Sequence, residues 1–243
     1  LSFMIQDLDT PIVLTGSQLP IGMLRTDGKE NLISAIEIAA ARMNEQPLVP
    51  EVTIFFENRL FRGNRTTKHN ADHFNAFRSD NYPVLAEAGI SIKYNHAYIS
   101  YPTGSRELKT YTRLDTNLAI LKIFPGITPA VVDGVCSIAG LKAIIIETFG
   151  SGNAPTSSWF IDRIKKAVES GIVVLNVTQC HAGSVDMEKY ETGLLLKKIG
   201  VRSGHDITTE AAVTKLMFLL GKNNGNDDIY HQLDISLSGE ISA

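Results

Sequence analysis

The chain has 243 residues, of which 44% are hydrophobic and 20% are charged, and its 26 acidic and 23 basic side chains give a formal net charge of -3. This length allows one large domain or two ordinary ones, either with a sizeable core. The small negative charge excludes binding of nucleic acid through a basic field, and the ordinary composition excludes collagen-like, coiled-coil and disordered proteins.

The first 56 residues predict two strands separated by a helix. Residues 1–8 read as the end of a helix that stops before Pro11, and because the chain has no initiator Met we expect it to be part of a longer protein. Residues 11–15 predict a parallel strand covered on both faces, and residues 52–56 predict the next strand. Helical spacing of apolar residues predicts an amphipathic helix over residues 31–43, formed by Leu32, Ile36, Ala39, Ala40 and Met43.

A polar segment follows at residues 58–80, which is too rich in Arg, Asn, His and Lys to be expected in a core. Residues 90–101 alternate between polar and apolar side chains and predict a strand, and residues 102–105 predict a turn after it. The composition becomes polar again around residues 111–117. We place a domain boundary there, between residues 1–113 and residues 118–243.

Beyond this boundary, strands and helices are expected to alternate. Strands are predicted over residues 118–124, 142–148 and 172–177. Helices are predicted over residues 128–139, 156–170, 190–199, 208–220 and 227–237. Because each strand is a continuous run of Ile, Val and Leu, the pattern indicates an α/β fold with a parallel sheet.

The sequence excludes a protein with a membrane-spanning apolar run and disfavours a disulfide-rich protein. No apolar run reaches the roughly 18 residues needed to span a bilayer. The cysteines, Cys136 and Cys180, are too few for a disulfide framework, which favours a reducing compartment.

Cys180 and His181 are neighbours in sequence and should point apart, so we expect Cys180 to be a buried structural cysteine rather than a nucleophile.

Small, hydroxyl and amide side chains follow the predicted strands, where parallel sheets bind their ligands. These segments are Thr15–Pro20, Arg62–Lys68 and Gly150–Pro155, and their side chains suit a small polar ligand. Lys68, which follows Thr66 and Thr67, has two open interpretations. It is either a solvated charge or a partly desolvated ammonium that tunes a hydroxyl nucleophile.

Three other patterns have unremarkable explanations. Residues 150–153 contain two glycines of a dinucleotide fingerprint but lack the third glycine and the acidic residue, which disfavours nucleotide binding. His69 and His73 could share one face of a helix, but a third ligand is not evident and we expect no metal site. Asp27–Gly28 is typical of a turn in which Asp27 accepts local backbone hydrogen bonds.

Taken together, four segments in this order resemble bacterial type I (cytoplasmic) L-asparaginases. They are Thr15–Pro20, Arg25–Leu32, Asn58–Lys68 and Gly150–Pro155, and the similarity continues through residues 177–180 and 208–211. The resemblance implies an α/β protein with a parallel-sheet, Rossmann-like N-terminal domain and a smaller α/β C-terminal domain. It also implies a cytoplasmic homodimer or homotetramer without a nucleic-acid or membrane partner.

The chemistry implied by the resemblance is hydrolysis of L-asparagine to L-aspartate and ammonia without a metal or organic cofactor. In this family a Thr hydroxyl attacks the amide carbon, while a second Thr, an Asp and a Lys manage the protons and backbone groups hold the oxyanion. The family places its first Thr in a Thr-Gly-Gly-Thr motif and the second Thr and the Asp in a Gly-Thr-Asp motif. Neither motif occurs among these 243 residues.

The resemblance therefore carries over only in part. Lys68 matches the catalytic Lys, Ser17 matches a position whose backbone borders the substrate amide, and Asn153 matches the loop that approaches the neighbouring subunit's active site. We expect the N-terminal domain to be incomplete, the nucleophile to lie outside this chain, and the chain alone to be inactive. Two alternatives stay open: the asparaginase-like subunit of a tRNA-dependent amidotransferase, and a non-catalytic module that binds an amino acid.

Overall fold

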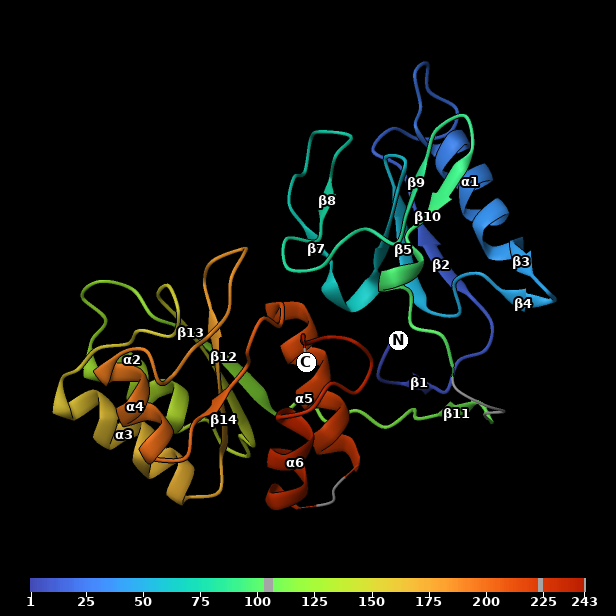
Figure 1. The fold of residues 1–243 in the computed structure, drawn as a ribbon. Coiled ribbons are helices and arrows are strands. Elements are labelled where there is room, and N and C mark those ends of the chain that lie inside the picture. Colours follow the sequence, from blue (N-terminus) through green and yellow to red (C-terminus); the bar gives the residue numbers. More distant parts are fainter. Residues whose placement is uncertain (103–106, 223–224, 243) are drawn as a thin grey trace. The chain divides into compact units, whose positions relative to one another are not determined.

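The computed structural model describes residues 1–102, 107–222 and 225–242, and its fold is α/β, as predicted (Figure 1). The chain divides into two units, residues 1–111 and 112–243. Of the turn predicted at residues 102–105, residues 103–105 lie outside the described residues. Within the described ranges, no helix is long and apolar enough to cross a membrane.

The first unit is built on a five-stranded sheet with the order β10-β9-β6-β5-β2. Its strands are β2 (Ile12–Thr15), β5 (Val52–Phe56), β6 (Arg59–Arg62), β9 (Ala86–Ala88) and β10 (Ile92–Tyr94). β2 and β5 are parallel, while the other neighbours are antiparallel. β2 lies at the edge of the sheet, and Leu14 is 44% exposed, so the expectation that this strand is covered on both faces is wrong.

Among its described residues, this unit also has three short strand pairs and two 3-10 turns. They are β1 (Ile5–Gln6) with β11 (Lys109–Thr110), β3 (Arg42–Met43) with β4 (Gln46–Pro47), β7 (Thr67–Lys68) with β8 (Phe77–Arg78), and the turns Gly63–Arg65 and His96–Tyr98. The helix end predicted at residues 1–8 is wrong. Ile5 N donates to Leu1 O at 3.0 Å, which closes a single turn before β1 pairs with β11.

Helix α1 (Gly28–Ala40) packs on the sheet through a different face from the one predicted. Its buried residues are Asn31, Ala35 and Ile38, whereas Leu32 and Ile36 are 46% and 60% exposed. Ala35 and Ile38 belong to the same core cluster as Phe55 and Leu60 of the strands. The face of the helix with the most apolar residues is therefore not the one that is buried.

The polar segment at residues 58–80 is not solvent-exposed throughout, contrary to the expectation. Its Arg62 side chain is buried beside Glu51, with Nε 2.5 Å from a carboxylate oxygen, and its guanidinium lies 4.3 Å from the centre of the Tyr82 ring. Arg65 is also buried, 5.1 Å from the same ring. Burial opposes the charge of Arg62, but the hydrogen bond and charge of Glu51 offset this, so the pKa of Arg62 is raised.

The second unit has a four-stranded sheet in which every neighbouring pair is parallel, which confirms the predicted sheet type. Its strands are β12 (Leu118–Lys122), β13 (Ala143–Thr148), β14 (Val173–Thr178) and β15 (Arg202–Ser203). Its helices are α2 (Pro129–Cys136), α3 (Ser158–Glu169), α4 (Glu191–Lys198), α5 (Thr209–Lys222) and α6 (Asn226–Leu233). Figure 1 shows α2, α3 and α4 on one side of this sheet and α5 and α6 on the other.

The core of this unit forms where the sheet meets α2, α3 and α4. Leu121, Ile144, Ile146 and Val174 from the strands contact Phe160 and other buried residues of the helices. Because both faces of the sheet are covered by helices, the strands can be apolar throughout, which explains the continuous Ile and Val runs in the sequence.

Gly221 should be intolerant of a side chain although it lies in a helix. A Cβ there would overlap the Arg113 carbonyl oxygen and lie 3.0 Å from Leu114 Cα, and both neighbours are backbone atoms. We therefore expect Gly221→Ala to lower the free energy of unfolding by about 1–3 kcal/mol in urea titrations.

The matched control is Gly134→Ala in α2. A Cβ at Gly134 meets no atom within 4 Å, so this change should stabilise the protein by about 0.5–1 kcal/mol through helix propensity. Equal effects of the two substitutions would contradict the close approach of α5 to residues 113–114.

Candidate functional site

The first candidate residue, Ser17, lies in an exposed turn directly after β2, here called the Ser17 turn (residues 15–19). Asp27 holds this turn: its carboxylate accepts hydrogen bonds from Gln18 N at 3.0 Å and Leu19 N at 3.1 Å. The expected local turn at Asp27 is therefore wrong, since these donors lie nine and eight residues earlier. The structure places Ser17 at the carboxyl end of its strand, where the α/β pattern predicts ligands.

The second candidate, Lys68, lies on β7 and pairs with Phe77 of β8, in what is here called the Lys68 hairpin (residues 67–78). The ring of Phe77 packs on Phe56 at the end of β5, with 5.1 Å between the ring centres. The Lys68 side chain is exposed, and it forms no ion pair or side-chain hydrogen bond with any residue that the structure describes. The partly desolvated ammonium considered from sequence would therefore require another segment to cover it.

Gln18 joins these two parts of the site. Its side-chain amide donates to Ala71 O at 2.8 Å and to His73 O at 3.0 Å, both in the loop of the Lys68 hairpin. Nothing in the sequence indicates this role except the position of Gln18 beside Ser17. The structure thus brings the turn that carries Ser17 and the hairpin that carries Lys68 together.

His69 and His73 belong to a loop and not to a helix, so they do not share a helix face as considered from sequence. Asn70 organises this loop, since its side-chain oxygen accepts from Asp72 N at 2.8 Å and His73 N at 3.0 Å. Among the described residues, no group of three or more His, Cys, Asp or Glu side chains could hold a metal ion.

The third candidate, Asn153, lies in the second unit, in a tight turn after β13. Its backbone exchanges hydrogen bonds with Phe149, at 2.9 Å and 2.8 Å, and its side-chain oxygen accepts from the Thr192 hydroxyl at 3.0 Å. Gly150 and Gly152 have positive φ values of 52° and 112°. The two glycines are therefore needed for this turn, which accounts for the partial resemblance to a dinucleotide fingerprint.

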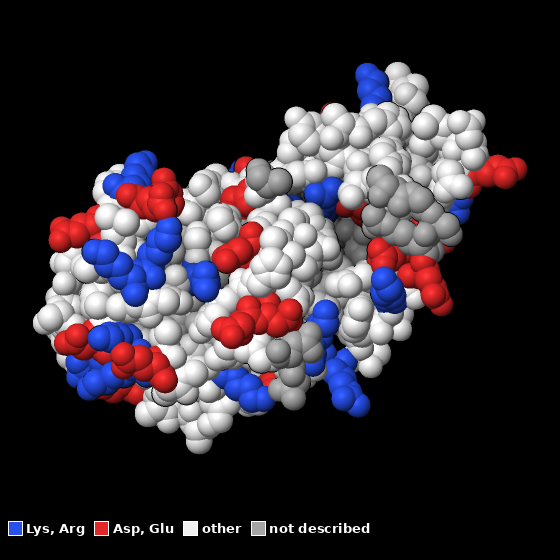
Figure 2. Space-filling view, turned by 60° about the horizontal axis from the view of Figure 1, so that its bottom comes forward, with Lys and Arg blue, Asp and Glu red and all other residues white. Residues whose placement is uncertain are grey.

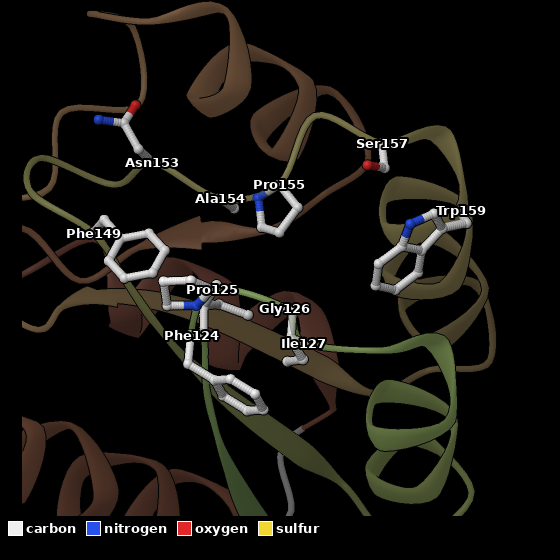
Figure 3. A pocket seen from close by; sticks show the side chains of 11 residues that line it. Phe124, Pro125, Gly126, Ile127, Phe149, Asn153, Ala154, Pro155, Ser157 and Trp159 are labelled. Carbon is white, nitrogen blue, oxygen red and sulfur yellow. The ribbon is translucent and has the colours of Figure 1, made fainter.

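A cavity of about 380 Å³ adjoins this turn (Figure 3). Its walls are mostly apolar, with Asn153 and Ser157 as the polar exceptions; the aromatic and proline side chains are Phe124, Pro125, Phe149, Pro155 and Trp159. This lining suits apolar or aromatic groups better than a charged amino acid. The cavity by itself therefore does not identify the substrate.

Cys180 was expected to be buried, but it is exposed. It follows β14 in a turn, where its backbone N donates to the Thr178 hydroxyl at 3.0 Å. All six residues of β14 are buried, but Cys180 lies two residues beyond the end of this strand.

Figure 2 shows acidic and basic side chains interspersed over the face that it draws, without a large area of one sign.

Two family models together match most of the chain. Residues 1–100 match the model described as Asparaginase, N-terminal, and residues 117–233 match the model described as Glutaminase/Asparaginase C-terminal domain. L-asparaginase 1 of Escherichia coli (strain K12) is 42% identical over 242 residues, an alignment that covers 100% of this chain and 70% of the relative.

Other similar proteins extend this picture. The 60 kDa lysophospholipase of Homo sapiens is 39% identical over 243 residues, with 100% of this chain but only 41% of that protein covered. Among solved structures, L-asparaginase I from Vibrio cholerae O1 biovar eltor superposes with a TM-score of 0.90 at 39% identity, covering 100% of this chain and 71% of that one. This chain is therefore similar to L-asparaginases both in sequence and in fold.

Proposed function

Since the chain belongs to the glutaminase/asparaginase family, with bacterial L-asparaginases of type I among its relatives, we propose that it forms the larger part of an amidohydrolase that converts L-asparagine to L-aspartate and ammonia. The observation that carries this proposal is the 42% identity to E. coli L-asparaginase 1 along the whole chain, which extends over 70% of that enzyme. The lysophospholipase name carries less weight, because only 41% of that relative is covered.

In this proposal, each candidate residue has a separate task. The Lys68 ammonium favours deprotonation of a Thr hydroxyl, the backbone at Ser17 borders the amide of the substrate, and Asn153 approaches the active site of a neighbouring subunit. The Gln18 hydrogen bonds that join the Ser17 turn to the Lys68 hairpin support the first two assignments. The assembly would be a homodimer or homotetramer, and no metal or organic cofactor takes part.

The nucleophile in this proposal is not among residues 1–243, because they contain neither Thr-Gly-Gly-Thr nor Gly-Thr-Asp. The amidotransferase-subunit alternative is less well supported. The relative at 42% identity is named L-asparaginase, and the Gly-Ser-Gln-Leu-Pro form of residues 16–20 fits free-standing enzymes better. A non-catalytic binding module would be favoured only if no nucleophile-bearing segment restored turnover.

Ammonia release from L-asparagine tests the proposal. We expect the purified 243-residue chain to release no ammonia above a heat-killed control. Without the Thr nucleophile, Lys68 and the backbone at Ser17 cannot form an acyl-enzyme. Joining the part of E. coli L-asparaginase 1 that lies outside the alignment to the N-terminal end of this chain should restore ammonia release.

The matched control for this chimera carries the same E. coli segment with both threonines of its Thr-Gly-Gly-Thr motif changed to Val, and it should be inactive. Turnover by the 243-residue chain alone would contradict the assignment of the nucleophile to another segment. A folded chimera without any turnover would overturn the proposed function.

A further inference from the structure

Asp27 has an unusual set of partners for a residue that precedes a helix. Its carboxylate makes no hydrogen bond to the first amides of α1, as a capping side chain would. Instead one oxygen accepts from Gln18 N and Leu19 N, and the other lies 3.0 Å from Gln18 N. Hydrogen bonds from amides to a carboxylate are charge-assisted and stronger than neutral ones. The Asp27 carboxylate therefore accepts from backbone amides of the Ser17 turn and not from those of its own helix.

Asn31, one helical turn further along α1, holds the other side of the same turn. Its side chain is buried, with the residue 3% exposed, and its amide donates to Gly16 O at 2.9 Å and to an Asp27 carboxylate oxygen at 3.2 Å. Hydrogen bonds from α1 and its preceding residue thus reach the positions on both sides of Ser17. A buried polar side chain with such partners fixes a conformation, because a displaced turn would leave its amide unpaired.

Gly28 determines how closely Ser17 approaches the helix. A Cβ at this position would lie 3.1 Å from Ser17 Cβ, 3.2 Å from Thr26 Oγ1 and 3.3 Å from Ser17 Oγ, so these two side chains would have to move by a few tenths of an ångström. Gly28 lies at the start of α1 with no positive φ. An Ala there is compatible with the helix but not with the present position of Ser17.

From these contacts we infer that Asp27 is a positioning residue for amide hydrolysis: together with Asn31 and Gly28, it fixes the place of Ser17 at the carboxyl end of β2. This inference rests on the proposed function, in which the backbone at Ser17 borders the substrate amide. A displacement of a fraction of an ångström at such a position lowers the rate strongly, since the reacting groups must be held in a narrow geometry.

The hydrogen bonds can be tested on the 243-residue chain itself. In Asp27→Asn, amide hydrogen exchange followed by NMR should be about 10- to 100-fold faster at Gln18 and Leu19, because each loses a carboxylate acceptor. The control is Glu30→Gln, which removes a carboxylate from the first turn of the same helix without touching the Ser17 turn. It should leave both exchange rates unchanged.

The consequence for the substrate is measured in the chimera that releases ammonia. Asp27→Asn should lower kcat/KM for L-asparagine about 10- to 100-fold, with KM raised more than kcat is lowered. Gly28→Ala should also raise KM while the Tm stays the same or rises, because Ala favours the helix and the added Cβ displaces only the Ser17 and Thr26 side chains. A purely structural role would not raise KM in a variant of undiminished stability.

Each outcome bears on the inference. Unchanged exchange at Gln18 and Leu19 in Asp27→Asn, or a normal KM in both variants, would overturn the positioning role while leaving the proposed function intact. An inactive wild-type chimera would overturn the proposed function, and the positioning role with it. Faster exchange together with a raised KM in Asp27→Asn, and a raised KM in Gly28→Ala, is the result expected.

Discussion

Replacing Lys215 with Met should lower the free energy of unfolding of the second unit by about 3–5 kcal/mol. Lys215 lies on α5, and its side chain is 1% exposed; its partner Glu240 is 0% exposed, with Nζ and a carboxylate oxygen 2.7 Å apart. The substitution leaves the carboxylate buried without its counter-charge. An isolated buried charge is costly because no water replaces the lost partner.

Both ends of this ion pair also hold the backbone after α6. The Lys215 ammonium donates to Ile235 O at 2.7 Å and to Leu233 O at 3.3 Å, while the Glu240 carboxylate accepts from Ser238 N at 2.7 Å and Leu237 N at 3.0 Å. Burial lowers the pKa of Lys215, although the charge and hydrogen bond of Glu240 favour the ammonium. Burying this ion pair therefore costs desolvation free energy. Removing one partner destabilises the protein by more than the intact pair stabilises it.

Urea unfolding followed by the fluorescence of Trp159, the single tryptophan, measures this effect in the second unit. The double variant Lys215→Met with Glu240→Leu should recover part of the loss, since no charge stays buried, but not all of it, because the backbone groups lose their partners. Lys165→Met removes an exposed ion pair and should change stability by less than about 0.5 kcal/mol. A loss under about 1 kcal/mol for Lys215→Met would show that water reaches Glu240.

The second unit could be predicted from sequence because its signals are local. Pro129 marks the first residue of α2, Gly171 with its φ of 91° ends α3, and each strand is a run of apolar residues between such signals. What sequence did not show is β15, which has only two residues, and the segment after Leu233, where the expected helix gives way to turns that Glu240 holds.

The first unit was predicted less well because its residues find partners far along the chain. Arg62 is buried against Glu51 and the Tyr82 ring, and Asn31 is buried against Gly16. Neither burial can be inferred from hydrophobic periodicity, since the periodicity counts these residues as polar. The same reason explains Asp27, whose distant donors cannot be distinguished in sequence from those of an ordinary turn. For Lys68 the residues alone left two interpretations open, and only the resemblance of motifs assigned roles to Lys68, Ser17 and Asn153.

Replacing Lys68 with Met in the ammonia-releasing chimera should lower kcat about 10²- to 10⁴-fold. The Lys68 side chain forms no ion pair or side-chain hydrogen bond within the described residues, so none of their carboxylates neutralises its charge. A positive charge beside a Thr hydroxyl lowers the cost of the alkoxide, and Met removes that charge while keeping an unbranched side chain of similar length. The effect grows once a second segment covers Lys68, because exclusion of water strengthens the interaction between charges.

The matched control is Lys93→Met, since Lys93 is likewise an exposed lysine on a short strand of the first unit, β10. Lys93→Met should keep near-normal kcat. Both variants lose one positive charge, so a difference in kcat between them is due to the position of the lysine and not to net charge. Lys68→Arg should recover only a minor part of the rate, because a planar guanidinium places its protons differently from a compact ammonium. Both Met variants should unfold within about 0.5 kcal/mol of the parent, as expected for exposed sites. If Lys68→Met turns over asparagine as fast as Lys93→Met, then Lys68 is a solvated surface charge, and the proton chemistry must lie with another group.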